Sequence, residues 1–168
     1  FPNLPLMKIS AFYKEHGCYV EWYDSKTHYD IVYLSKVFSF SPEPFSEINA
    51  DEVIRGGSGY AIKLINGKEV FDKENHLNLS DRIEHIYPDY SLYGIKNTAY
   101  GFMSRGCPRG CSFCHVQAKE GCSSHKVADL SEFWNGQKKI ELFDPNTFAC
   151  PEWKDIVTQL IESKAQVD

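Results

Sequence analysis

Three of the chain's six cysteines lie within eight consecutive positions. Cys107, Cys111 and Cys114 follow the spacing C-x3-C-x2-C inside the segment GFMSRGCPRGCSFCHVQAKEG. A secreted scaffold spreads its cysteines to join distant loops, whereas a cytosolic protein clusters them to hold metal. Soft thiolates select zinc, copper(I) or iron–sulfur clusters. The spacing therefore predicts a metal or cluster site, in a protein that works in the reducing environment of the cytoplasm.

Three thiolates leave the identity of a fourth ligand open. A structural site is usually closed by a fourth protein ligand, so three cysteines around a cubane iron–sulfur cluster would leave one iron free for a small molecule. Zinc is the alternative. The second and third cysteines would then form a C-x2-C knuckle, the first would add a ligand, and His115, Cys122 or His125 would supply the fourth.

The composition excludes several classes of protein. The 168 residues carry 18 Lys and Arg against 23 Asp and Glu, which gives a net charge of −5. No stretch rich in Lys or Arg stands out, so no broad nucleic-acid surface is expected. No apolar run approaches the ~20 residues of a membrane span, and the first residues lack the features of a signal peptide. The chain begins with Phe1 rather than Met, which indicates that a segment precedes it.

The elements that must position the cysteines alternate between helix and strand. A helix capped by Asn3 is expected to end at Gly17, and Pro151 and an apolar stripe predict a helix over 153–161. Further short helices are expected at 81–86 and 129–134. Strands are expected at 18–22, 30–34, 51–55, 98–104 and 139–143, the second of them buried on both faces. The segment 63–79 lacks periodicity and is interpreted as irregular.

This order of elements predicts an α/β fold with a mostly parallel sheet. Turn residues at 87–97 separate two α/β blocks and mark the expected domain boundary. The strand at 98–104 leads directly into the cysteines. The thiolates are therefore expected at the carboxyl end of a parallel strand, where open α/β sheets and α/β barrels build their sites.

The cysteine loop resembles the signature of the radical S-adenosylmethionine superfamily. That family usually carries an aromatic residue just before the third cysteine, and Phe113 lies there. The flanking SRGCPRGCSFC and the later LFDPN resemble a subgroup in which a Rossmann-like domain of the cobalamin-binding type precedes the barrel. The resemblance implies that residues 1–95 form this leading domain. Residues 96–168 would then form the first strand–helix units of a (β/α) barrel.

The resemblance also implies roles for particular residues. The three cysteines would ligate a 4Fe–4S cluster, and its open iron would bind S-adenosylmethionine. An electron from a donor would cleave that ligand to methionine and a 5′-deoxyadenosyl radical, which abstracts hydrogen from an unidentified substrate. Phe113 would lie against the adenine. The family's Gly-Gly-Glu is replaced by DPN, so Asp144 and Asn146 are the candidates there, although Asp144 could equally cap the turn after its strand.

Two expectations concern what the chain lacks. The Asp-x-His-x-x-Gly loop that supplies a histidine to cobalamin is missing, and His16-Gly17 does not reproduce it, so cobalamin is not expected. The function could then be that of a Rossmann-like small-molecule-binding domain carrying a metal loop.

A complete (β/α)8 barrel needs about 200 or more residues, and only about 70 follow the boundary. The chain alone is therefore not expected to be a competent enzyme, and its open sheet edge and apolar stripe favour self-association.

Overall fold

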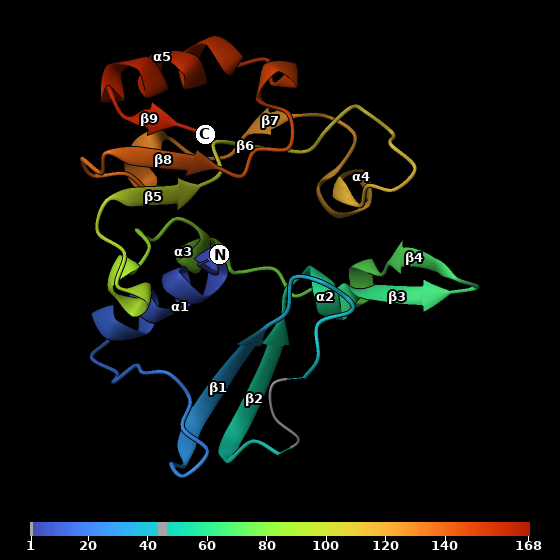
Figure 1. Ribbon diagram of the computed structural model, residues 1–168, viewed down its shortest axis with the longest axis vertical. Helices are drawn as coiled ribbons and strands as arrows, with labels where there is room; N and C mark the ends of the chain where they lie inside the picture. The colour runs from blue at the N-terminus through green and yellow to red at the C-terminus, as the bar shows by residue number, and fades with distance from the viewer. Residues whose placement is uncertain (1, 44–46) are drawn as a thin grey trace.

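Helices and short strands alternate along residues 2–43 and 47–168, which a computed structural model describes (Figure 1). The helices are α1 Leu4–Glu15, α2 Ser58–Ala61, α3 Asp81–Glu84, α4 Val116–Glu120 and α5 Trp153–Ser163. Single 3-10 turns are η1 Lys73–Asn75, η2 Tyr90–Tyr93, η3 Leu130–Glu132 and η4 Thr147–Ala149. The strands are β1 Tyr29–Ser35, β2 Ala50–Gly56, β3 Ile62–Ile65, β4 Lys68–Phe71, β5 Thr98–Gly101, β6 Ser104–Arg105, β7 His125–Lys126, β8 Lys139–Leu142 and β9 Gln166–Val167.

The strands form two parallel sheets and two antiparallel pairs. Strand β1 pairs with β2 in parallel, and β5, β8 and β9 form a parallel sheet in that order. The pairs β3–β4 and β6–β7 are antiparallel. The prediction of a mixed α/β fold with parallel strands is thereby confirmed. The strands of the described ranges close no barrel.

Helix α1 begins and ends where the sequence predicts. The Asn3 side chain accepts a hydrogen bond from the Leu6 amide at 3.1 Å, and Pro5 lies in the first turn, where its missing N–H costs nothing. Gly17 follows the last turn with φ 79°, a left-handed conformation that glycine adopts without strain. On the inner side of the helix, Leu4 and Met7 are buried.

One hydrophobic core joins α1 to the C-terminal sheet. Its buried members are Met7, Tyr90, Ala99, Met103, Leu130, Phe133, Ile140, Cys150 and Ile156. In Figure 1, α5 covers one side of the β5–β8–β9 sheet, and α1 and α3 lie below β5. The core therefore contains residues from both sides of the expected boundary at 87–97. The division into residues 1–95 and 96–168 stays a prediction.

Several expected elements differ in the structure. Residues 18–22 form no strand: Tyr19 is 85% exposed, and Trp22 donates its indole N–H to the Leu92 carbonyl at 3.0 Å. Strand β1 exists, but Val32 is its one buried residue, and β2 is its sole partner in the described chain. At residues 18–22, the aromatic side chains that predicted a strand lie on the surface instead.

The segment 63–79, expected to be irregular, contains the β3–β4 hairpin. Asn66 and Gly67 connect the strands with φ values of 51° and 74°, as the favoured two-residue hairpin turn requires. Residues 129–134 form a single 3-10 turn, η3, in place of a longer helix. The Asn-Gly signal was present in the sequence, but the strands beside it are too short and too exposed to show clear alternation.

The last helix, α5, is confirmed, and its apolar stripe is covered at one end. Ile156 is fully buried, whereas Ile161 is 71% exposed. The chain then enters β9, which pairs with β8 in parallel. The predicted self-association at this face stays a prediction. Among the described residues, no helix combines the length and the apolar character that crossing a membrane requires.

Candidate functional site

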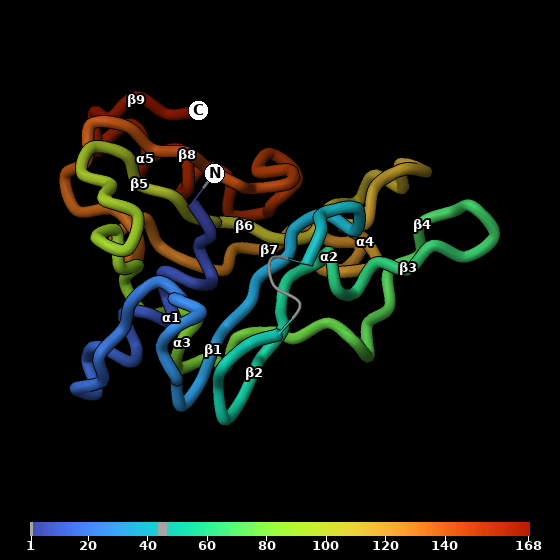
Figure 2. The backbone as a smooth tube through the Cα atoms, turned by 60° about the horizontal axis from the view of Figure 1, so that its bottom comes forward, coloured from blue at the N-terminus to red at the C-terminus, as the bar shows by residue number. Residues whose placement is uncertain are grey.

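The cysteine loop leaves the C-terminal sheet just after β5. Strand β5 runs parallel to β8, and the short strands β6 and β7 bracket the loop that contains all three motif cysteines. Figure 2 shows this loop, with α4, projecting to the same side of the molecule as the β3–β4 hairpin. The expected placement of the cysteines beyond the carboxyl end of a parallel strand therefore agrees with the chain path.

The base of the loop is closed by backbone contacts. Ser104 and Arg105 pair with Lys126 and His125 in the β6–β7 ladder, and the Cys107 amide donates to the Gly121 carbonyl at 3.3 Å. Gly106 has φ 81°, and a Cβ atom there would lie 2.1 Å from the Ser123 carbonyl oxygen. Only glycine fits this position, because both the backbone conformation and the space exclude a side chain.

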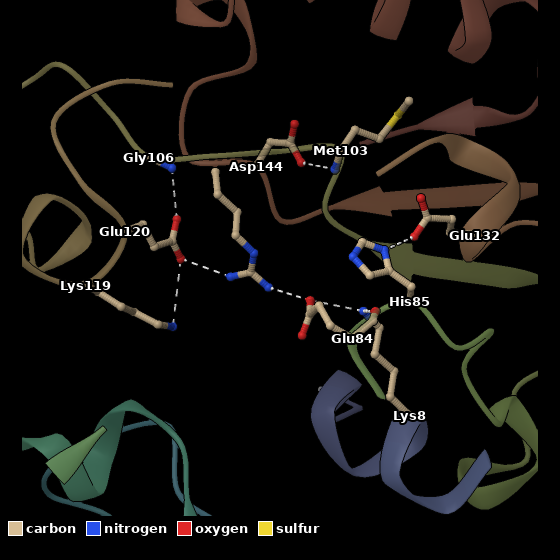
Figure 3. Close-up of polar contacts among 10 residues, drawn as sticks. Lys8, Glu84, His85, Met103, Gly106, Lys119, Glu120, Glu132 and Asp144 are labelled. Carbon is tan, nitrogen blue, oxygen red and sulfur yellow. Dashed lines mark hydrogen bonds and ion pairs between the residues drawn. The ribbon is translucent and has the colours of Figure 1, made fainter. Parts of the chain in front are cut away.

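A buried carboxylate reinforces the same closure. The Glu120 side chain, 9% exposed, accepts from the Gly106 amide at 3.1 Å and from Arg105 Nη1 at 3.2 Å. Arg105 Nη2 in turn donates to Glu84 Oε1 at 3.2 Å, and Lys8 Nζ reaches the same oxygen at 3.2 Å. Figure 3 shows this chain of contacts running from the loop through Glu84 to Lys8 on α1. The loop is thus tied to the N-terminal helix.

Burial disfavours the charged form of both lysines in this network. Desolvation lowers the pKa of the Lys8 ammonium, although Glu84 opposes the shift. Desolvation likewise lowers the pKa of Lys119, which lies 3.9 Å from Glu120, and Arg105 adds to the shift by repulsion. A partly buried ion-pair network costs desolvation energy unless its hydrogen bonds are satisfied. Here the hydrogen bonds of Glu120 and Glu84 provide that compensation.

Asp144 binds the chain that leads into the cysteines. Its carboxylate accepts from the Met103 and Ser104 amides, each at 2.8 Å, and from the Ser104 hydroxyl at 2.6 Å. Thr147 Oγ1 is a further donor at 3.2 Å. Asp144 therefore joins the end of β8 to the link between β5 and β6. Asp144 therefore does more than cap the turn after its own strand, since it also binds the chain before the cysteines. A contact from Asp144 to S-adenosylmethionine stays a prediction.

Asn146 contacts the first cysteine of the motif. Its side-chain Nδ2 lies 3.7 Å from Cys107 Sγ, within reach of an N–H···S hydrogen bond. Its backbone carbonyl accepts from the hydroxyl of the buried Ser124 at 3.1 Å. The predicted pair Asp144 and Asn146 thus touches the cysteine loop on both of its flanks and at Cys107 itself.

The three motif thiols differ in exposure. Cys107 is 8% exposed, whereas Cys111 and Cys114 are exposed and joined by a turn in which the Cys114 amide donates to the Cys111 carbonyl at 3.0 Å. Phe113 between them is 85% exposed. Within residues 2–43 and 47–168, no group of three or more His, Cys, Asp or Glu side chains is gathered closely enough to hold a metal ion. The structure therefore places the thiols on one loop without bringing their sulfurs to one point.

The donor set nevertheless suits a thiolate-bound metal or cluster. All six cysteines of the chain are free, so no disulfide competes for the three thiols. One thiol is fixed at the closed base, and two lie on an exposed segment that is not packed in the hydrophobic core. Soft sulfur ligands on a single short loop are what iron–sulfur clusters and zinc bind. The residues fit such a group by their chemistry.

The two histidines that could supply the fourth zinc ligand contact different parts of the chain. His115 Nε2 is 3.3 Å from Glu69 Oε2 of β4, while His125 Nδ1 is 3.4 Å from the Ser123 carbonyl oxygen. Cys122 is exposed and follows Gly121 at the loop base. The two histidines thus make these contacts with groups other than the motif cysteines.

Sequence reasoning missed the residues that close the loop. Arg105, Gly106 and Glu120 flank the cysteines, but an Arg-Gly pair and one glutamate in a short helix are common features with no distinctive spacing. The SRG before the first cysteine was the available signal, because a glycine directly before a motif cysteine suggests a constrained backbone.

Comparison with known proteins gives no match: no family model fits the chain, and neither a curated protein nor a solved structure is similar to it. The fold and the loop geometry are therefore the basis for any functional assignment.

Proposed function

We propose that the chain is part of a radical S-adenosylmethionine enzyme and that its cysteine loop holds a 4Fe–4S cluster. The observation that carries the proposal is a loop with three free thiols, closed at its base and placed after the first strand of a parallel sheet. In this proposal the three thiols would leave one iron of the cluster open, whereas a closed structural zinc site would need His115, Cys122 or His125 as its fourth ligand. In this proposal the leading residues 1–95 form the Rossmann-like domain, and the β1–β2 parallel pair supports it.

Each candidate residue has a place in this proposal. Cys107, Cys111 and Cys114 would hold the cluster, and the exposed Phe113 ring is available to stack on an adenine. When bound, the cluster would pass an electron from a donor to S-adenosylmethionine and cleave it to methionine and a 5′-deoxyadenosyl radical. Asp144 and Asn146 follow β8, the strand beside β5, and lie within hydrogen-bonding distance of the loop. The hydrogen bonds of these two residues hold the base of the cysteine loop.

Anaerobic reconstitution followed by metal analysis tests the proposal. We expect about four iron and four sulfide per chain, as one cluster requires. Cys107→Ala, Cys111→Ala and Cys114→Ala should each abolish or strongly reduce this content. Cys18→Ala is the matched control, because Cys18 is an exposed free cysteine far along the chain from the motif. Stoichiometric zinc in the purified protein, lost on replacing His115 or His125, would support the zinc alternative instead.

Ligand binding is tested by electron paramagnetic resonance of the reduced cluster. Saturating S-adenosylmethionine should change the spectrum if one iron is open. Phe113→Ala should weaken this binding, because a stacking partner for the adenine is lost. Tyr19→Ala is the control, since Tyr19 is as exposed as Phe113, at 85%, and its hydroxyl contacts Glu21 rather than the loop. An unchanged spectrum at saturating ligand would contradict an open site.

A further inference from the structure

Asn146 stands apart from the other residues near the motif, because its side chain contacts a cysteine sulfur directly. The amide Nδ2 lies 3.7 Å from Cys107 Sγ, and both groups are shielded: Cys107 is buried and Asn146 is partly buried. An amide N–H that donates to sulfur in such a place is protected from competition with water. The contact is therefore worth more than a similar one at the exposed Cys111 or Cys114.

The backbone holds Asn146 in this position. Its carbonyl accepts from the hydroxyl of Ser124, which is 6% exposed. Two residues earlier, the Asp144 carboxylate is bound by the Met103 and Ser104 amides. The segment after β8 is thus fastened to both flanks of the cysteine loop, which holds the Asn146 backbone beside Cys107.

The chemistry of cluster ligands gives this contact a consequence. Hydrogen bonds to the sulfurs of an iron–sulfur cluster and the degree of solvent exposure set its reduction potential. Reduction adds negative charge that is partly carried by the sulfur ligands, and an N–H donor stabilises that charge. A donor at Cys107 therefore favours the reduced cluster and raises its potential.

We propose that Asn146 is a positioning residue that tunes the cluster through its hydrogen bond to Cys107 and makes it easier to reduce. The inference rests on the proposed function and goes beyond it, because it assigns Asn146 to the cluster ligand rather than to S-adenosylmethionine. The three cysteines are then not equivalent. Cys107 has a side-chain donor in Asn146, whereas Cys111 and Cys114 are exposed.

The test compares reduction potentials of the reconstituted protein and its variants. Asn146→Ala removes the donor, and Asn146→Asp keeps the shape while replacing the N–H group with an acceptor. We expect both to keep the iron and sulfide content of the parent. At a fixed potential, the ratio of reduced to oxidised cluster should fall about tenfold in Asn146→Ala, or ~59 mV for one electron, and further in Asn146→Asp. Asn135→Ala, at an exposed asparagine, should leave the potential unchanged.

The outcomes separate this inference from the function it rests on. A parent protein that binds no iron would overturn both. Parent and variants with equal clusters and equal potentials would overturn the role of Asn146 and leave the proposed function standing. Loss of the cluster in both variants would show that Asn146 acts in cluster assembly, which contradicts a tuning role. A potential that falls in the order Asn, Ala, Asp with constant iron content would support the inference.

Discussion

The two parallel strand pairs of the molecule differ in how they are stabilised. Strands β1 and β2 have seven residues each, yet Val32 is the one fully buried side chain of β1. Strands β5 and β8 have four residues each, but Ala99 and Ile140 are completely buried between α5, η3 and α1. The length of a strand pair therefore does not decide how deeply its side chains are buried. The elements packed on its faces do, and the short, well-covered pair is the one that carries the cysteine loop.

The sharpest test of this comparison uses the same substitution in both pairs. Ile140→Ala in β8 should lower the free energy of unfolding by about 2–5 kcal/mol, because it leaves a cavity in the core. Ile54→Ala in β2 is the control and should cost distinctly less, because Ile54 is only partly buried. Denaturant unfolding measures both values. Equal losses would show that the N-terminal pair is as well packed as the C-terminal sheet.

A smaller effect on stability is expected at the cysteine loop, where glycines at the base and at the tip can be compared. Gly106→Ala should destabilise the protein by about 1–3 kcal/mol, because φ 81° is strained for alanine and its Cβ meets the Ser123 carbonyl. Gly110→Ala is the matched control at the tip. A Cβ there would come no closer than 3.5 Å to Gln117, so the change should be small. If thermal unfolding finds the two variants equally stable, the loop base is not rigid.

A pH-dependent effect tests how firmly α1 is attached to the core. Burial alone would raise the pKa of Asp89, but hydrogen bonds from Lys14, Ser10 and Ser91 outweigh it and lower that pKa to about 2. Because the folded pKa lies below the unfolded one, the stabilisation is complete above about pH 4 and is lost as the pH falls toward 2. Asp89→Asn should lower the free energy of unfolding by about 1–2 kcal/mol at neutral pH. This range allows for solvent screening of the ion pair, because its partner Lys14 is exposed.

The measurement for Asp89 is the free energy of unfolding as a function of pH. The difference between the parent and Asp89→Asn should shrink as the pH is lowered from about 4 to 2. Asp51→Asn is the control, because the Asp51 side chain is 71% exposed and surface substitutions change stability by about 0.5 kcal/mol at most. A difference for Asp89→Asn that is constant across this range would contradict the assigned cause.

Much of the element order could be predicted from the sequence. Helix α1 has an Asn cap and a Gly stop, and the spacing of apolar residues predicts α5. Strand β2 contains the β-branched pair Val53 and Ile54 before a glycine turn, and β8 alternates charged and apolar residues. These signals are local, so they survive whatever surrounds them. The absent strand at 18–22 shows the limit, because the same aromatic residues can pair in a sheet or stack on a surface as Trp22 and Tyr93 do.

The thiols of the candidate site could be predicted from the sequence, but the contacts that close the cysteine loop could not. Cysteines at close spacing are rare enough to predict a metal site by themselves. The contacts of Glu120 with Gly106, and of Asn146 with Cys107, join residues 14 and 39 positions apart. Such contacts depend on how the chain returns after α4 and after β8. Glu120 looks like an ordinary surface residue in the sequence, and Asn146 is a candidate there for a contact with S-adenosylmethionine rather than with Cys107.

The closed base of the cysteine loop has a consequence for limited proteolysis. Arg109 is exposed on the segment between Cys107 and Cys111, where trypsin cleaves after arginine in accessible loops. A single cut there would leave residues 1–109 and 110–168 joined by the β6–β7 ladder, by Glu120 and by a core that contains both Met7 and Ile156. The nicked protein would therefore migrate as one particle under native conditions and as two pieces after denaturation.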